Sequence, residues 1–411
     1  MPTLNLCFKV HIPYRLNDYT AGSNHSANVY FNNTAAATII NQLADECYLP
    51  ANAIIAGVIE QQQEQCKLAF SISGTAIELL LAYRPDVIDS FRQLVETGCV
   101  EILAETYYNS LSWLYSKKEF RRQVEKHGRL VKKVFDVETA VLRNTELIYN
   151  NELALFAETL GFKGVLCEGL DKILQGRTPN QVYAAPATNK IGLLLRNVNL
   201  SDDIAFRFDD KHWNEFPLTA EKYASWIHSH SHAEHINLFM DYETFGIHKK
   251  PASGIFEFLE NLPAAITKNN DWQFTTPSEA IERSNNREVY DSPRTISWKD
   301  KDIECCVWCE NTWQNNMLKK IYDIEYMLHK SGQTEACDWW GRLQSADHFY
   351  YMSVTGRTAN DAYQELNPFP SAEAAYRNYL AIITDFEISL IQEGLLQFKG
   401  QHHSLQHTPL Y

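Results

Sequence analysis

The sequence lacks an excess of basic residues. It contains 37 Lys and Arg residues against 51 Asp and Glu residues, so the formal net charge is −14 at pH 7. Proteins that bind nucleic acids do so largely through a basic surface that neutralises phosphate groups. The charge balance therefore excludes a nucleic acid as the expected partner.

The sequence also lacks a long hydrophobic run. Its purest apolar stretch, residues 53–59, is far shorter than the roughly 20 residues that a membrane-spanning helix needs. The N-terminus has neither the basic segment nor the apolar core of a secretory signal. We therefore expect no membrane partner and a cytoplasmic location.

A disulfide pattern is missing as well. The nine cysteines are an odd number without regular spacing, which disfavours a secreted disulfide scaffold. Cys305, Cys306 and Cys309 lie close together, but no fourth ligand at a suitable spacing accompanies them, so a zinc site is not expected. We expect neither a cofactor nor a metal ion.

What the chain does contain is a regular alternation of strand and helix patterns. Strands are expected at residues 4–10, 67–73, 99–103, 139–143, 164–167, 191–196, 235–240 and 272–275. Helices are expected at residues 35–64, 75–96, 117–135, 148–160, 220–228, 254–261 and 277–284. About seven alternations over some 285 residues predict a parallel α/β sheet and favour a TIM-like barrel.

The pattern changes after residue 285. Helical signals cover residues 313–330 and 372–398, with no further strand pattern between them. We therefore expect two domains. Residues 1–285 would form a catalytic barrel, and residues 286–411 a C-terminal helical domain packed beside the active-site cleft.

Acidic side chains follow several of the expected strands, where a barrel collects its functional groups. They are Glu101 with Glu105, Glu146, Glu168, and Asp241 with Glu243. Taken singly, each carboxylate is more simply a loop cap or an ion-pair partner. Asp241, however, directly follows the apolar residues 238–240, and such a setting raises a carboxyl pKa as a general acid requires. Paired carboxylates with abundant aromatic side chains are typical of a retaining glycosidase.

A series of short stretches also occurs, in the same order, in a known family. The stretches are HIP at 11–13, CYLPAN at 47–52, SISG at 71–74, GCVE at 98–101, LAETYY at 103–108, RNTELIYNNE at 143–152, EG at 168–169, LSDDIAFRF at 200–208, FMDYETFG at 239–246 and LQSADHFYYM at 343–352. Through them the chain resembles glycoside hydrolase family 57, and most of all its α-amylase branch.

The resemblance implies an incomplete (β/α)7 TIM-like barrel with a C-terminal α-helical domain, and retaining cleavage of an α-glucan or maltooligosaccharide. It matches Glu168 to the family's nucleophile and Asp241 to its acid/base. In a retaining mechanism these two carboxyl groups would lie about 5–5.5 Å apart. The family's other motif blocks, which line the substrate cleft, contain His11, Glu101, Glu243 and Asp347. His348 is either a further cleft residue or a packed histidine.

Other functions stay open. If a sugar hydroxyl outcompetes water, the same site is a 4-α-glucanotransferase or a branching enzyme. A metal-dependent deacetylase or mannosidase on a similar barrel would need His11 with Asp241 or His348 as ligands. A glucan-binding protein without catalysis is a further alternative, against which the intact pair of Glu168 and Asp241 argues.

A histidine cluster, His228, His230, His232 and His235, precedes the strand that ends near Asp241. His228 and His232 have the spacing of metal ligands on a helix. Because the run closes a helix and leads into a strand, we expect a surface or helix-end role instead.

Overall fold

The computed structural model describes residues 1–19, 27–62, 65–188, 190–230, 232–268, 271–285, 287–298, 307–355 and 367–392. The chain folds into two compact units, each assembled from three chain segments. Unit 1 consists of Met1–Ile12, Ala37–Tyr107 and Arg121–Trp298, and unit 2 of Pro13–Ala36, Tyr108–Phe120 and Lys299–Tyr411. Neither unit is therefore continuous in sequence.

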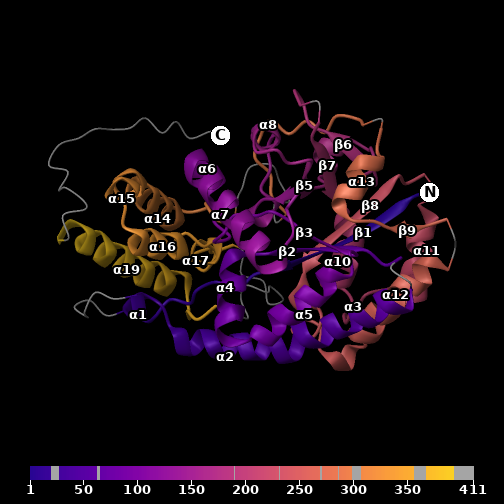
Figure 1. The fold of residues 1–411 in the computed structure, drawn as a ribbon, viewed down its shortest axis with the longest axis horizontal. Coiled ribbons are helices and arrows are strands. Elements are labelled where there is room, and N and C mark those ends of the chain that lie inside the picture. The colour runs from indigo at the N-terminus through magenta and orange to yellow at the C-terminus, as the bar shows by residue number, and fades with distance from the viewer. Residues whose placement is uncertain are drawn as a thin grey trace. The chain divides into compact units, whose positions relative to one another are not determined.

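Unit 1 is built on a curled sheet (Figure 1). Its seven main strands run parallel, in the order β3-β2-β1-β8-β7-β5-β4. The strands are β1 (Thr3–Val10), β2 (Leu68–Ile72), β3 (Val100–Ile102), β4 (Val141–Arg143), β5 (Gly164–Glu168), β6 (Val182–Ala184), β7 (Gly192–Arg196), β8 (His235–Asp241) and β9 (Gln273–Phe274). β6 pairs antiparallel with β7, and β9 lies beside β1.

The barrel is incomplete, as the family resemblance implies. The edge strands β3 and β4 meet only through an isolated parallel bridge between Ala104 and Leu142. β7 and β8 are joined by a single register pair, Arg196 with Asn237. The prediction of an incomplete (β/α)7 barrel followed by a helical C-terminal region is confirmed.

The helices follow the strands of unit 1 and build most of unit 2. In unit 1 they are the last part of α2 (Asn33–Leu43), α3 (Leu49–Gln61), α4 (Gly74–Tyr83), α5 (Pro85–Glu96), most of α7 (Lys117–Phe135), α8 (Asn151–Thr159), α9 (Asp171–Leu174), α10 (Val198–Ala205), α11 (Ala220–Ser229), α12 (Ile255–Thr267) and α13 (Pro277–Arg283). Within unit 1, α5, α3, α12 and α11 pack side by side in that order.

The break between α4 and α5 shows how the sequence sets these boundaries. Pro85 has no amide hydrogen to donate, so it ends α4 and begins α5 at its first position. The Ser73 side chain accepts a hydrogen bond from the amide of Ala76 and caps the start of α4. Gly98, with φ of 74°, follows the end of α5. The single helix expected at residues 75–96 is therefore two helices, divided before Pro85.

The N-terminal end of the barrel interior is filled by α13. Ala280 and Ile281 of this helix belong to the same buried cluster as Cys7, Leu166 and Phe239 from the strands. Gly164 and Gly192 start β5 and β7, and a Cβ atom on either would lie within 3 Å of Ile281. The two glycines therefore make room for Ile281.

Unit 2 is helical in the part of the chain that the structure describes. Its elements are α1 (Ala27–Tyr30), α6 (Ser112–Tyr115), α14 (Thr312–Asp323), α15 (Glu325–Ser331), α16 (Thr334–Leu343), α17 (Ala346–Tyr350) and α19 (Ala372–Gln392), together with the first turns of α2 and α7. Buried polar contacts tie the helices together: Trp340 donates to the carbonyl of Ile321, and Tyr379 to that of Leu343. Among the described helices, none combines the length and the apolar character that crossing a bilayer requires.

Candidate active site

The two matched carboxylates stand at the ends of two strands of the same sheet. β5 ends at Glu168 and β8 ends at Asp241, with β7 between them in the strand order. Both strands are parallel to β7, so both carboxylates lie at the carboxyl edge of the sheet, where barrel enzymes place their chemistry. The Glu168 side chain is 1% exposed, whereas that of Asp241 is 16% exposed.

Arg196, the last residue of β7, holds Glu168 in place. Its Nη1 lies 3.1 Å from Glu168 Oε1, and its Nε donates to the carbonyl of Phe239 on β8 at 2.8 Å. Its Nη2 forms an ion pair with Asp202 at the same time. A guanidinium bound at three sides is fixed in direction, so it orients the Glu168 carboxylate and compensates its negative charge.

Lys9 plays the corresponding part for Asp241. This β1 residue stands opposite Asp241 in register, and its Nζ lies 3.5 Å from Asp241 Oδ1 and 3.0 Å from Glu146 Oε1. Its side chain is 4% exposed. A buried ammonium requires such partners, because burying it unpaired would cost several kcal/mol.

Glu146 has an unusual backbone. It adopts φ of 56° and ψ of 29°, in the left-handed region that non-glycine residues rarely occupy. Asn144 caps this turn, which follows β4, and Arg143 lies 3.9 Å from Glu146 and 3.3 Å from Glu105. Strained residues of this kind cluster at functional sites. The strain here turns a carboxylate toward Lys9.

Trp298 supplies an aromatic ring next to both cations. Its Nε1 donates to Glu146 Oε2 at 2.7 Å, and its ring packs edge-on against Phe239. Lys9 Nζ and the guanidinium carbon of Arg196 lie 5.7 and 5.6 Å from its ring centroid. The indole therefore contacts the two cations that hold the two candidate catalytic carboxylates.

Glu243 lies two residues beyond Asp241 and is buried. Burial, together with the nearby charge of Asp241, raises the pKa of Glu243 to about 7, although a hydrogen bond from Tyr48 opposes the shift. Tyr48 closes a π-helical turn, Ala44–Tyr48, of the kind found often at functional sites. Gly246 allows the segment after Asp241 to pack there, because a Cβ atom on it would lie 1.9 Å from the carbonyl of Glu46.

The structure brings some of the other predicted residues to this edge and leaves Glu101 away from it. His11 follows β1 directly, is buried, and lies 2.8 Å from the Ser73 hydroxyl through Nδ1. Glu101 instead receives hydrogen bonds from the amide and the hydroxyl of Ser278 on α13. Because α13 fills the opposite end of the barrel interior, this placement argues against substrate binding by Glu101. Glu105 is the residue of this segment that joins the charged cluster, through Arg143 and Ser71.

Asp347 and His348 belong to unit 2, on α17. The Asp347 carboxylate accepts a hydrogen bond of 2.6 Å from Ser345. His348 lies 3.2 Å from the carbonyl of Arg342 through Nε2, and its ring packs on Tyr379. The contacts of His348 within unit 2 are those of a packed histidine.

The histidine cluster is dispersed over separate partners. His228 contacts the carbonyl of Ile266, and His235 contacts Thr3. α11 ends at Ser229, so His228 and His232 do not share a helix. Burial lowers the pKa of His235 to about 3. His228 lies at the helix end as expected, whereas His235 is buried at the start of β8 and not at the surface. The expectation about Cys305 and Cys306 lies outside the described residues.

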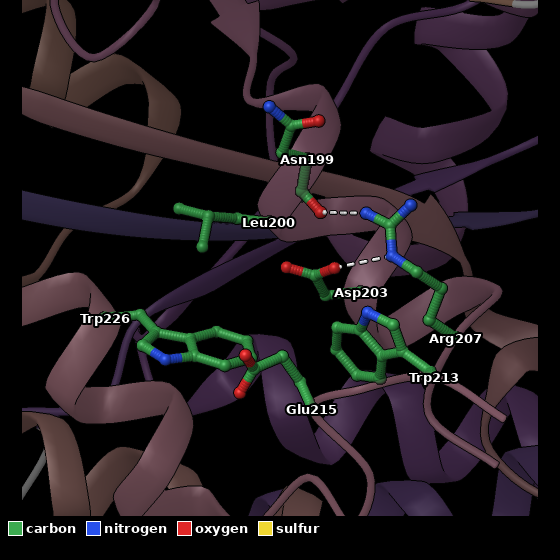
Figure 2. A pocket seen from close by; sticks show the side chains of 7 residues that line it. All are labelled: Asn199, Leu200, Asp203, Arg207, Trp213, Glu215 and Trp226. Carbon is green, nitrogen blue, oxygen red and sulfur yellow. Dashed lines mark hydrogen bonds and ion pairs between the residues drawn. The ribbon is translucent and has the colours of Figure 1, made fainter. Parts of the chain in front are cut away.

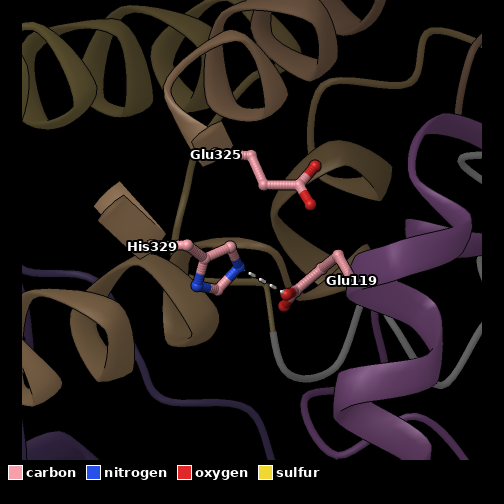
Figure 3. Close-up of side chains that lie close together, drawn as sticks. All are labelled: Glu119, Glu325 and His329. Atoms are coloured by element: carbon pink, nitrogen blue, oxygen red, sulfur yellow. Dashed lines mark hydrogen bonds and ion pairs between the residues drawn. The ribbon is translucent and has the colours of Figure 1, made fainter. Parts of the chain in front are cut away.

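Unit 2 contains a group of side chains that sequence inspection does not single out. Ligand-type atoms of Glu119, Glu325 and His329 lie within 4.8 Å of one another (Figure 3). His329 lies 3.3 Å from Glu119, which also accepts a hydrogen bond from Gln344, and Glu325 accepts one from Ser116. These protein contacts account for the group as a partly buried hydrogen-bonded cluster.

The chain is similar to known proteins in sequence and in fold. A protein of Methanocaldococcus jannaschii named "Putative alpha-amylase" is 38% identical over 392 residues, which cover 92% of this chain and 83% of that protein. A GH57 branching enzyme from Thermococcus kodakaraensis has a TM-score of 0.69 at 13% identity, covering 97% of this chain and 92% of that one. The alpha-amylase AmyC from Thermotoga maritima has a TM-score of 0.64 at 11% identity, covering 96% and 94%. At such identities, the solved structures show the fold alone.

The family assignment comes from the sequence. The profile of Glycosyl hydrolase family 57 matches residues 5–293, which include Lys9, Glu168, Arg196 and Asp241. The match covers more than half of the chain, and the relative from Methanocaldococcus jannaschii adds a long alignment at 38% identity. The chain therefore belongs to glycosyl hydrolase family 57.

Proposed function

We propose that this protein is a retaining α-glucan hydrolase of the α-amylase type. The observation that carries the proposal is the contrast between its two strand-end carboxylates. Glu168 is buried against a fixed guanidinium, and Asp241 is partly exposed beside an ammonium. Two carboxylates in different settings are what a nucleophile and an acid/base require. The name of the 38% identical relative supports an α-glucan as the substrate.

The mechanism would proceed by double displacement. Asp241 protonates the glycosidic oxygen while Glu168 attacks the anomeric carbon, so the leaving sugar departs and a β-glycosyl-enzyme forms. Asp241 then takes a proton from water, which attacks the same carbon and releases Glu168. Two inversions retain the α configuration. His11, Glu243 and Asp347 are proposed as substrate-binding residues, since they match the family's motif blocks. His348 is left out because its contacts are those of a packed histidine. Glu101 is left out because of its bonds to Ser278.

Metal-dependent chemistry at Asp241 is the less favoured alternative. Lys9 Nζ lies 3.5 Å from Asp241 Oδ1 and so already supplies this carboxylate with a fixed positive charge. A divalent ion bound at the same carboxylate would be repelled by that ammonium. The alternative is therefore kept as an outcome of the test.

The test is incubation of the purified protein with maltoheptaose, followed by product chromatography and by NMR of the newly formed anomers. Shorter maltooligosaccharides with the α configuration are expected. Glu168→Ala should lower the rate by roughly 10³-fold or more, because no other side chain replaces the nucleophile. Exposed Glu260→Ala, on α12, is the matched control and should leave the rate unchanged.

Three other results would change the assignment. Products longer than maltoheptaose would assign a 4-α-glucanotransferase. Activity that EDTA abolishes and a divalent ion restores would assign metal-dependent chemistry. Binding of maltoheptaose with no turnover in the unsubstituted protein would contradict hydrolysis of linear glucans and leave a binding role.

A further inference from the structure

Unit 1 carries an open pocket of about 450 Å³ that the proposed mechanism does not use (Figure 2). It is formed by α10, α11 and the segment that joins them, and this volume is within the range of pockets that hold small ligands. The side chains that define it are Asp203, Arg207, Trp213, Glu215 and Trp226.

The pocket is separate from the candidate active site, although both use α10. Asp202 forms an ion pair with Arg196, which holds Glu168. Asp203, the next residue, lines the pocket and accepts a hydrogen bond from Arg207. Successive helical residues point about 100° apart. One side of α10 therefore serves the active-site cluster, and another side serves the pocket.

Two tryptophans give the pocket its shape. The rings of Trp213 and Trp226 are 6.0 Å apart at 75° to each other, so they form a corner (Figure 2). Both residues are half-buried, and the joining segment also exposes Phe206 and Phe216. Partly exposed aromatic rings can serve as platforms for the flat apolar face of a ligand.

The charged side chains of the pocket are paired with one another or with a neighbour. Arg207 donates to Asp203 at 2.6 Å and to the carbonyl of Asn199 at 3.1 Å. Lys222 lies 2.8 Å from Glu215. A phosphorylated ligand would therefore find Arg207, the cation of the pocket lining, already paired. The carboxylate oxygens can accept hydrogen bonds from hydroxyl groups. These features select a neutral ligand with many hydroxyls and with apolar faces, which describes a sugar chain.

We propose that the corner of Trp213 and Trp226 is a second glucan-binding site, which holds a polymeric α-glucan away from the point of cleavage. Two platforms at a steep angle suit a chain that curves from one ring to the next, as α-linked glucans do, better than a flat β-linked chain. Only the identity of the sugar rests on the proposed function. The existence of the site rests on the pocket.

The test is affinity electrophoresis in native gels that contain glycogen, with gels containing hydroxyethylcellulose for comparison. All variants are made in the full chain carrying Glu168→Gln, so that the polymer is not cut. Trp213→Ala and Trp226→Ala should each weaken glycogen binding about tenfold, and Trp213→Phe should restore most of it. Tyr326→Ala removes an aromatic side chain that is 67% exposed in unit 2, and it is the matched control.

Glu215→Arg is a second pocket variant that should not disturb the hydrophobic core, because the Glu215 side chain is 49% exposed. It should also weaken glycogen binding, even if a tryptophan variant fails to fold. Binding as tight as the parent's in Glu215→Arg and in the folded tryptophan variants would overturn the proposal, as would a parent that glycogen does not retard.

The two proposals fail separately. Cleavage of maltoheptaose by the unsubstituted protein, with glycogen binding unaffected in the pocket variants, overturns the second site alone. Loss of glycogen binding in those variants, with no cleavage of maltoheptaose, supports the second site and overturns the hydrolase.

Discussion

At the scale of single residues, each candidate catalytic carboxylate has its own cation. Arg196 holds Glu168, and Lys9 lies beside Asp241. Trp298 contacts both cations through its ring. The carboxylates are thus positioned by charged neighbours that are themselves buried, and their orientation should depend on the shape of those neighbours as well as on their charge.

Arg196→Lys tests the dependence on shape. Lysine keeps the positive charge but cannot reach Glu168, Asp202 and the Phe239 carbonyl at once, as the guanidinium does. We expect kcat on maltoheptaose to fall about 10²-fold with a smaller change in KM. Arg121→Lys, at a half-exposed position, is the control. Wild-type kcat in Arg196→Lys would show that charge alone suffices.

Glu243→Gln tests the pKa of a buried group. The pKa of Glu243 is raised to about 7 in the folded protein, mainly by burial, from 4.5. The folded state therefore holds this proton more tightly than the unfolded state. The resulting stability is complete below pH 4.5 and is lost as the pH rises through 7.

Glu243→Gln should remove this pH-dependent loss of stability, because glutamine does not ionise. The loss in the parent is on the order of 3 kcal/mol. Urea unfolding at pH 5 and pH 8 measures the change in the free energy of unfolding between the two pH values. We expect the free energy of unfolding to depend less on pH in Glu243→Gln than in the parent, while Glu260→Gln, at an exposed position, changes nothing. The same pH dependence in both variants would contradict a raised pKa.

Sequence patterns identify the carboxylates of this site but do not identify its cations, Lys9 and Arg196. Glu168 and Asp241 are recognisable because they follow strand patterns within matched motifs. Lys9 stands in the polar half of an alternating strand, and in most sheets that half faces water. Only closure of the sheet turns it inward, where Asp241 and Glu146 meet it. Trp298 comes from a segment that looks irregular, so no local pattern could place it.

At the scale of elements, α13 and the start of two strands form one packing unit. Gly192→Ala would place a Cβ atom 2.9 Å from the Ile281 side chain, whereas Gly164→Ala would also meet the carbonyl of Gly192 at 2.5 Å. A side chain can be shortened by mutation, but a backbone carbonyl cannot be moved. The two glycines should therefore respond differently when Ile281 is truncated.

Double-mutant cycles measure the difference. Gly192→Ala should destabilise by about 1–3 kcal/mol and Ile281→Ala by about 2–5 kcal/mol. Their combination should cost less than the two added together, because the new methyl group fills part of the cavity. Gly164→Ala with Ile281→Ala should show a smaller rescue, and equal coupling in the two cycles would contradict this packing.

The helices and strands that the sequence predicts correctly are those with a strong local pattern of apolar and polar residues. The eight expected strands exist, and the expected helix at 117–135 has the bounds Lys117–Phe135 in the structure. β6 was missed because it has three residues and pairs antiparallel. α12 runs to Thr267 instead of ending near residue 261, because Leu262 and Ile266 are buried and continue the helix through Pro263. Tertiary packing decides these cases.

At the scale of the whole molecule, each unit draws on distant parts of the chain. Unit 2 includes Pro13–Ala36 and Tyr108–Phe120, which lie between segments of unit 1. Tyr30, Tyr108 and Trp113 from these two segments are buried. A fragment that stops at residue 298 would retain both segments but lose the rest of unit 2.

Such a fragment should not fold as the full chain does. We expect the fragment 1–298 to bind the dye ANS strongly and to unfold without the cooperative urea transition of the full chain, because its buried aromatic side chains lose their partners. Circular dichroism during urea unfolding and ANS fluorescence, each measured on the fragment and on the full chain, test whether the fragment folds as the full chain does. A fragment with full-chain cooperativity would show that unit 1 is independent.

The central position of β1 has a consequence for biosynthesis. β1 is the first strand to leave the ribosome, yet its neighbour β8 follows 232 residues later. At about 5–20 residues per second, β1 waits roughly 10–50 s for that neighbour. β2, on its other side, follows much sooner, so one edge of this buried strand of eight residues stays unpaired during the wait, which invites aggregation. Asn5 and Lys9 interrupt its apolar run, so the polar side chains that later line the barrel interior also protect the nascent chain.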